Sequence, residues 1–540
     1  MKNRLTILFC IIFIIVVQPI KAQTATVQAD KWMTIYNDVL RQLDINYADT
    51  LNYERLVSTS INQMLRQIDP YTIYIPEEKS NDIRLMTTGK YGGIGALIMQ
   101  RNGNVYISDP YEGMPAQRND VRAGDKILEV DGKKVTGMTT SEVSALLRGT
   151  PHSMVSLKLE RESVAKPISV SFEREEIQIN PVGYYEVIEP QTGYIFFREF
   201  TEGSADIFRD AVREMVKSGQ ITSLVIDLRS NGGGIIDEAV KLMGLFVDKG
   251  TEIVSTKGKT GTSNRTYRTP YQPEFKDMKL AVLVDENTAS AAEIVSGSLQ
   301  DLDRAVIIGK RTYGKGLVQV IRPIAYNGHL KVTTSKYYIP SGRCIQAIDY
   351  SKHRSDGSVE RVPDSLTHAF QTKHGRIVHD GGGIEPDIIT EEDSSKVDIT
   401  YTLYTQHMFF DYATRYRAKH DTIAKISAFA PTDDDLRDFI DFLKEKKFSY
   451  ETETSKYFKD VIKMAKHEDI DTLLVAELEQ MQQRLTPNYE DAIIQHATEV
   501  KELMGREIIQ RYYYEHGLIS FTLRTDKELK TALEQLHKNQ

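Results

Sequence analysis

A serine and a lysine that could act as a nucleophile and its base lie in the middle of the chain. The run Leu280–Val284 is apolar and rich in valine, and turn-forming residues follow it at 285–287, so it predicts a buried strand. Ser290 comes next, where small residues open a helix. The free amides and the dipole of a helix N-terminus favour the negative charge of an oxyanion. Lys315 lies between Gly314 and Gly316, after a second short strand predicted at 305–308.

These residue types are those of a Ser–Lys catalytic pair. A lysine can accept the proton of a serine when burial lowers its pKa from about 10.4 towards about 7–8. Gln319 lies on the next predicted strand, 317–322, where its side chain can orient a lysine amine through a hydrogen bond. The spacing by itself does not decide for catalysis. A serine at a helix start is usually a cap, and a lysine between glycines usually faces solvent.

A nucleotide-binding loop is the competing interpretation of the glycines before Lys315. The stretch from Gly309 to Lys315 imitates the pattern GxxxxGK. That motif requires a serine or threonine next and then a helix. Because Gly316 and a predicted strand follow instead, we exclude nucleotide binding.

Two motifs together resemble those of the carboxyl-terminal processing peptidases, also called tail-specific proteases. They read TASAAEIVSGSLQD at 288–301 and GKRTYGKGLVQ at 309–319. The resemblance implies a serine endopeptidase that cuts exported proteins near their C-termini through an acyl-enzyme. It assigns Ser290 as the nucleophile, Lys315 as the general base and Gln319 as the residue that orients the lysine.

The oxyanion donors are also implied by this resemblance. The segment DLRSNGGG at 227–234 is similar to the family segment that supplies one backbone amide. Gly233 is the favoured donor, with Gly232 and Gly234 as alternatives, and the Ala291 amide after the nucleophile is the second donor. The segments 336–343 and 381–387 resemble the closing parts of the family's catalytic domain.

Residues 88–175 predict a small β-rich domain. Strands are expected at 96–99, 105–108, 126–130 and 155–159 and a helix at 140–147, and Asp131-Gly132 indicates a hairpin. The segments 91–98 and 123–130 resemble parts of PDZ domains. This implies that glycine-loop amides hold a terminal carboxylate while the adjacent strand pairs with the peptide. The expected peptide-binding residues are Tyr91, Gly92, Gly93, Ile94, Gly95 and Ala96.

Arg148 is a candidate for coupling peptide capture to the opening of the active site. It follows the predicted helix 140–147, at a place where a PDZ domain can face a catalytic domain. A guanidinium can pair with a carboxylate or with backbone carbonyls across such a joint. A cation that merely caps a helix C-terminus explains the position equally well.

Composition and segment order predict a multidomain α/β protein. The chain has 540 residues, 40% of them hydrophobic, and a formal net charge of −8, which argues against nucleic-acid binding. We expect a signal peptide at 1–22, a helical N-terminal segment at 24–76 and a PDZ-like β-rich domain at 88–175. A mixed α/β serine protease core is expected at 177–393 and a helical C-terminal extension at 394–540.

The first 22 residues have the pattern of a secretory signal peptide. Lys2 and Arg4 precede the apolar run Leu5–Val17, which is short for a membrane span. We therefore expect an exported, soluble protein in the periplasm or outside the cell; an uncleaved N-terminal anchor is the alternative. Cys344 is then the one cysteine of the mature chain, which allows no intrachain disulfide. No metal, nucleotide or other cofactor is expected.

The expected partners are protein substrates with free, apolar C-terminal tails. The helical segments at 24–76 and 394–540 offer surfaces for packing or for a homodimer. Two other functions are left open. One is a catalytically silent PDZ adaptor that binds C-terminal peptides, and the other is a related protease with a Ser–His pair in which His329 or His353 is the base.

Overall fold

The computed structural model describes residues 28–538, apart from 163, 354–358, 391–397, 469 and 486–487. The signal peptide predicted at 1–22 lies outside the described residues. The chain divides into one unit that ends at Tyr74 and a second that begins at Ile75. In the first unit, residues 28–46 and α2 (Tyr53–Arg66) are helical, as predicted. No helix in the described part of the chain combines the length and apolar character that a membrane crossing needs.

A six-stranded sheet forms the centre of the predicted protease core. β10 is antiparallel to β11, and every later neighbouring pair is parallel. The strand order is β10 (Val182–Glu189), β11 (Thr192–Phe197), β12 (Ser223–Asp227), β15 (Lys279–Val284), β16 (Ala305–Gly309) and β23 (Ile388–Ile389). The associated helices are α6 (Ser204–Gly219), α7 (Ile236–Met243) and α8 (Ala291–Asp301).

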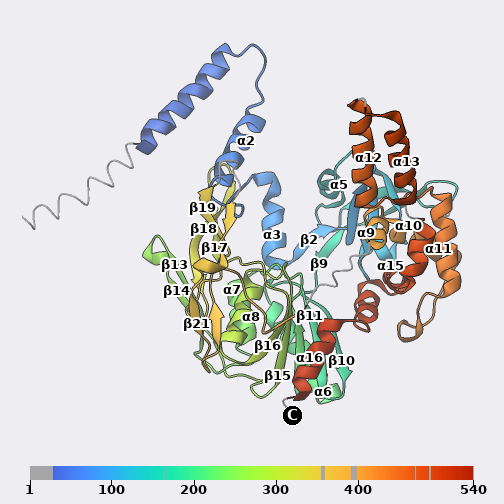
Figure 1. Ribbon diagram of the computed structural model, residues 1–540. Helices are drawn as coiled ribbons and strands as arrows, with labels where there is room; N and C mark the ends of the chain where they lie inside the picture. Colours follow the sequence, from blue (N-terminus) through green and yellow to red (C-terminus); the bar gives the residue numbers. More distant parts are fainter. Residues whose placement is uncertain are drawn as a thin grey trace, which may run out of the picture. The chain divides into compact units, whose positions relative to one another are not determined.

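Both faces of this sheet are buried, because successive strand residues point to opposite sides. Ile226 and Val282 belong to the core that the strands share with α6, α7 and α8. Val225 and Leu283 point the other way, into a core shared with α16 (Lys527–Lys538). Figure 1 shows α16 beside β15 and β16. Helix α16 is therefore a layer of the predicted protease core.

A second sheet carries the segment after Lys315. Its antiparallel strands pair in the order β17 (Leu317–Pro323), β18 (His329–Tyr338), β13 (Glu252–Gly258) and β14 (Arg265–Arg268). Two short antiparallel pairs follow in the chain: β19 (Ile348–His353) with β20 (Val359–Arg361), and β21 (Ala369–Gln371) with β22 (Ile377–His379).

The small β domain contains every strand and the helix predicted for it. Its sheet has the order β3 (Ala96–Arg101), β4 (Asn104–Pro110), β5 (Lys126–Val130), β7 (Met154–Glu160) and β8 (Ile168–Glu173), with β6 (Lys133–Lys134) beside β5. Asp131 and Gly132 have φ values of 50° and 78°, as a tight hairpin turn requires. The helices are α3 (Ser80–Thr88), α4 (Pro115–Arg118) and α5 (Thr140–Leu147), and β2 (Lys90–Gly93) pairs with β9 (Glu175–Gln178).

The C-terminal extension is helical, as predicted. Its helices are α9 (Asp398–Thr405), α10 (Met408–Lys419), α11 (Asp433–Glu445), α12 (Glu453–His467), α13 (Thr472–Leu485), α14 (Tyr489–Gln495), α15 (Ala497–Thr522) and α16. Leu436, Phe439, Ile440 and Leu443 of α11 are buried in one core. On α13, Leu473, Leu474 and Met481 are exposed, and Val475 and Leu478 pack against α12 instead.

Candidate active site

Ser290 lies at the strained turn where β15 leads into α8. Its φ is 57° and its ψ is −117°, a conformation that costs a non-glycine residue about 1–3 kcal/mol. The Ser290 amide donates to Glu293 Oε2 at 2.8 Å, and the Tyr337 hydroxyl donates to the Ser290 carbonyl at 3.2 Å. The next residue, Ala291, supplies the first amide of α8, whose position leaves it without an intrahelical acceptor. The turn thus presents a serine beside a helix N-terminus, as predicted.

Glu293 is completely buried and joins the serine turn to the lysine loop. Its Oε2 accepts the Ser290 amide at 2.8 Å and the Lys315 amide at 2.9 Å. Its Oε1 accepts the Thr312 hydroxyl at 2.6 Å and the Gly314 amide at 2.7 Å. Burial raises the pKa of this carboxyl, and the four donors oppose the rise. Four donors on four acceptor sites match an ionised carboxylate, which has no proton of its own to donate.

The role of Glu293 was not predicted from the sequence, although a local signal for it is present. Ser290 and Glu293 form the Ser-x-x-Glu pattern of a capping box, in which the glutamate bonds back to the amide of the cap residue. That local bond is present in the structure. The bonds from the same carboxylate to the loop 312–315 depend on the return of the chain through β16, which the local pattern does not reveal.

Lys315 lies just before β17, in a loop whose path depends on glycine. Gly314 has a φ of 84°, and a Cβ there would lie 2.3 Å from Ala347 Cβ. Gln319 lies on β17, and its Nε2 donates to Thr333 Oγ1 of β18 at 3.1 Å. The structure therefore ties Ser290 and Lys315 to one carboxylate and places Gln319 on the strand that leaves the lysine loop.

The predicted oxyanion residues also lie together. A Cβ on Gly233 would lie 2.7 Å from Ala289 O and 2.8 Å from Ala291 N, and the φ of Gly233 is 95°. The Gly233 amide donates to Asn231 Oδ1 at 2.8 Å in this conformation. At Gly232, a Cβ would meet no atom within 4 Å. The loop is thus in contact with the serine turn at Gly233 and open at Gly232.

Asn231 is a second site residue that was not predicted from the sequence. It is fully buried, and its Nδ2 donates to Phe197 O at 2.8 Å. Its own carbonyl accepts the Ala289 amide at 2.9 Å. Asn231 therefore links the end of β11, the glycine loop and the residue before Ser290.

The predicted peptide-binding residues lie at the start of the small β domain. Residues 91–93 belong to β2, which pairs with β9, and Ala96 begins β3. The Gly92 carbonyl accepts the Gly149 amide at 3.1 Å. A Cβ on Gly92 would lie 2.0 Å from Gly149 O, so this close approach requires glycine. Arg148 is the C-cap residue of α5, and its guanidinium carbon lies 5.1 Å from the centroid of the Tyr91 ring.

The geometry disfavours His329 as a base for Ser290. His329 begins β18, whereas the residue that contacts the Ser290 carbonyl, Tyr337, lies eight positions further along the strand. At about 3.3 Å per residue, the two are roughly 26 Å apart along the strand. The side chain of His353 lies outside the described residues. Over the described part of the chain, no group of three or more His, Cys, Asp or Glu residues is arranged to hold a metal ion.

Comparisons with known proteins divide the chain in the same order. The model of "Peptidase family S41" matches residues 191–353, that of "PDZ domain" residues 106–161, and that of "Probable PDZ-protease, C-terminal helical domain" residues 399–536. A carboxy-terminal-processing protease from Bartonella bacilliformis is 34% identical over 321 residues, which cover 59% of this chain and 73% of that protein. A "Probable CtpA-like serine protease" from Staphylococcus aureus is 32% identical over 365 residues, which cover 66% of this chain and 71% of that protein. The solved structure of a photosystem II D1 C-terminal processing protease has 26% sequence identity and a TM-score of 0.37, and covers 67% of this chain and 88% of that one.

Proposed function

Because the chain belongs to the carboxy-terminal-processing protease family, we propose that Ser290 is its nucleophile and Lys315 its general base. The protein is a serine-type C-terminal-processing protease of peptidase family S41 with a PDZ domain and a helical C-terminal domain. This confirms the family that the two motifs indicated and the multidomain α/β architecture predicted from composition and segment order. The observation that best supports this pair is at Glu293, where one carboxylate oxygen accepts the backbone amides of both Ser290 and Lys315.

The proposed reaction proceeds through an acyl-enzyme. Ser290 Oγ attacks the scissile carbonyl carbon while the neutral Lys315 amine takes the hydroxyl proton. The resulting ammonium gives this proton to the leaving amine, and the peptide bond breaks. Water then attacks the ester, with Lys315 again taking and returning a proton. Gln319 is proposed to orient the lysine from β17, where Thr333 anchors its amide nitrogen.

The oxyanion of each tetrahedral intermediate is proposed to accept bonds from the Ala291 amide and from the glycine loop. Gly233 is the proposed loop donor because it lies against Ala291 N. Its amide now donates to Asn231 Oδ1, so in this role it exchanges that acceptor for the substrate oxygen. The helix N-terminus at Ala291 adds a favourable dipole for the negative charge.

Substrate selection is proposed to depend on the free carboxylate of an apolar tail. The segment 91–95, whose first three residues end β2, would hold the carboxylate, and β3 would pair with the peptide backbone. Arg148 lies on the ring of Tyr91 in that segment, so it is proposed to respond to peptide capture there and to couple it to the catalytic domain. A peptide with an amidated C-terminus should then be cut more slowly than its free-acid twin. Equal rates would refute tail recognition by this loop.

The dyad is tested with purified mature protein and an unstructured, apolar-tailed substrate. Ser290→Ala and Lys315→Ala should each lower kcat by at least about a thousandfold, since the members of such a unit act together. Both variants should keep the unfolding temperature of the wild type. Near-wild-type cleavage by Lys315→Ala would refute the pair. Peptide binding without cleavage by the wild type would favour the adaptor.

Export and assembly are further parts of the proposal. The pattern at 1–22 supports a mature, soluble protein that begins near Gln23 outside the cytoplasm. The helical segments at 24–76 and 394–540 are the proposed homodimer surfaces. N-terminal sequencing tests the first statement, because an intact Met1 in the membrane fraction would favour the anchor. Light scattering of the full-length mature protein tests the second.

A further inference from the structure

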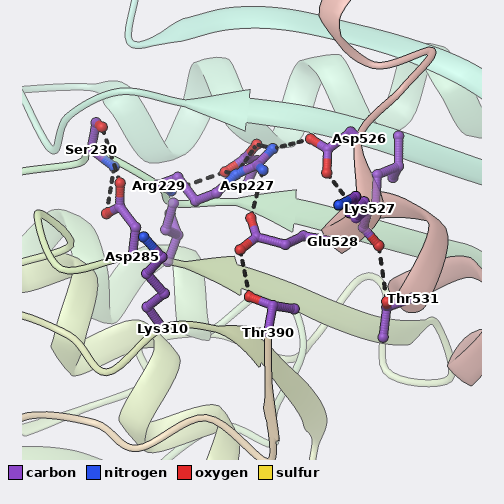
Figure 2. Close-up of polar contacts among 12 residues, drawn as sticks. Asp227, Arg229, Ser230, Asp285, Lys310, Thr390, Asp526, Lys527, Glu528 and Thr531 are labelled. Carbon is purple, nitrogen blue, oxygen red and sulfur yellow. Dashed lines mark hydrogen bonds and ion pairs between the residues drawn. The ribbon is translucent and has the colours of Figure 1, made fainter. Parts of the chain in front are cut away.

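Two carboxylates, those of Asp526 just before α16 and of Glu528 in its first turn, lie at the start of the oxyanion loop, residues 228–234 (Figure 2). Arg229 is the second residue after β12. Its Nη2 lies 2.7 Å from Asp526 Oδ2, and its Nη1 lies 2.7 Å from Glu528 Oε2. Asp227, at the end of β12, pairs with the same guanidinium. The side chains of Asp227 and Asp526 are only 2% and 6% exposed, so removing one partner would leave a charge buried without compensation.

Each of these carboxylates is held from a second side by a hydrogen bond. The bonds run from Leu529 N to Asp526 Oδ1 (2.9 Å), from Thr390 Oγ1 to Glu528 Oε1 (2.7 Å) and from Tyr194 OH to Asp227 Oδ2 (2.6 Å). Asp526 and Glu528 also lie at the N-terminal end of α16, where the helix dipole favours negative charge. The cluster is therefore a fixed, desolvated arrangement rather than a loose surface ion pair.

Apolar packing holds α16 where its carboxylates can reach Arg229. The helix buries Leu529, Ala532 and Leu536 against the central sheet. On the sheet side, the contacting residues include Val225 of β12 and Leu283 of β15. Strand β12 leads into the oxyanion loop and β15 leads into the serine turn. The helix therefore packs beneath the two strands that carry these segments.

The contacts continue from Arg229 to the nucleophile along one loop. The Arg229 amide donates to Asp227 Oδ1 at 2.9 Å, and the Ser230 amide donates to Asp285 Oδ1 at 2.8 Å. Asn231 then bonds the residue before Ser290, and Gly233 packs against Ser290 itself. A shift of Arg229 is therefore passed along the loop to Gly233 and to the serine turn.

We propose that Asp526 and Glu528 are positioning residues for catalysis, which hold the oxyanion loop beside Ser290 by fixing Arg229. The inference rests on the proposed role of that loop. It assigns a catalytic duty to the helical domain, outside the segment that matches the S41 peptidase model. When both carboxylates are neutral, Asp227 is the one ionic partner that Arg229 keeps among the described residues, and the loop is held less firmly. A displacement of about 1 Å in a catalytic segment can cost about 100-fold in rate.

The test compares the full-length double variant Asp526→Asn/Glu528→Gln with the wild type. We expect kcat to fall about 10- to 100-fold with a KM for the tail peptide that stays within about twofold. Affinity for a peptide boronic acid, whose tetrahedral adduct on serine places an oxygen in the oxyanion site, should fall by a similar factor. Binding of the uncleaved tail peptide, measured in the Ser290→Ala background, should not change.

Glu534→Gln is the matched control, because it removes the same charge from an exposed position of the same helix. Arg229→Gln should lower kcat as the double variant does. Adding Asp526→Asn and Glu528→Gln to it should then have no further effect, since the three residues act through one contact. If the double variant melts below the assay temperature, the single variants carry the test by the same criteria.

The inference is overturned if the carboxamide variants keep kcat within twofold of the wild type. It is also overturned if their losses multiply with that of Arg229→Gln, or if KM and unfolding temperature change while kcat does not. An active Ser290→Ala variant would instead refute the proposed dyad, so the two failures are distinguishable.

Discussion

Glu293→Gln tests whether one buried carboxylate organises both halves of the active site. Oε1 accepts hydrogen bonds of 2.6 and 2.7 Å, and Oε2 accepts bonds of 2.8 and 2.9 Å. Glutamine keeps the shape but replaces one oxygen with an NH2 group. In either orientation of the amide, two of the four protein donors then face the NH2 group and lose their acceptor. Each unsatisfied buried donor costs about 1–3 kcal/mol, so the substitution should cost about 2–6 kcal/mol.

The loss should appear in the rate as well as in stability. If the NH2 group replaces Oε2, the amides of Ser290 and Lys315 both lose their acceptor. If it replaces Oε1, the donors at Thr312 and Gly314 in the lysine loop lose theirs. Either outcome moves the lysine loop, and a shift of about 1 Å should lower kcat about 100-fold.

The assay measures kcat and KM on a quenched fluorescent peptide with a free apolar tail, together with the unfolding temperature. Glu286→Gln is the matched control, because its side chain is 58% exposed just before the same turn. Glu293→Asp keeps the charge but shortens the reach, and should fall between wild type and Glu293→Gln. The reasoning is wrong if Glu293→Gln keeps kcat within threefold of the wild type and melts at the same temperature.

Three further outcomes are expected. Gly233→Ala places a Cβ 2.7 Å from a backbone oxygen at a φ of 95°, so activity should be lost. Gly232→Ala, whose Cβ would meet no atom within 4 Å, should stay active. Equal activities of the two variants would contradict the close packing of Gly233 against the serine turn. Tyr337→Phe removes the 3.2 Å bond to the Ser290 carbonyl and should lower kcat about fivefold, by about 1 kcal/mol, with little change in unfolding temperature. Burial raises the pKa of Asp109 from 3.8 to about 6, so its protonated form stabilises the fold below pH 3.8, and this contribution is lost as the pH rises through about 6. The free energy of unfolding should thus lose at most about 3 kcal/mol from this group between pH 4 and pH 8. Asp109→Asn should reduce the fall in the free energy of unfolding over this pH range. An equal fall in the wild type and the variant would refute the raised pKa of Asp109.

The sequence alone determined the local frame of the active site. The valine-rich run before residue 285 and the small residues after Ser290 are local signals, and they predicted β15, the turn and α8. The glycines around Lys315 predicted a tight loop between two strands, which the structure confirms. Such features depend on neighbouring residues and on strand or helix periodicity, so they can be read along the chain.

The tertiary structure decided which residues far away in the sequence contact these active-site elements. The bond from Lys315 to Glu293 spans 22 positions, and the pair of Arg229 with Glu528 spans 299. The apolar spacing on α16 is that of an amphipathic helix, but no local pattern says that it covers the sheet face containing Val225 and Leu283. Likewise, four of the apolar residues of α13 are exposed although their spacing is helical: Leu473, Leu474, Met481 and Leu485. Periodicity reveals that a helix has an apolar face, whereas only the packing of the folded chain decides what that face meets and which buried charges must be paired.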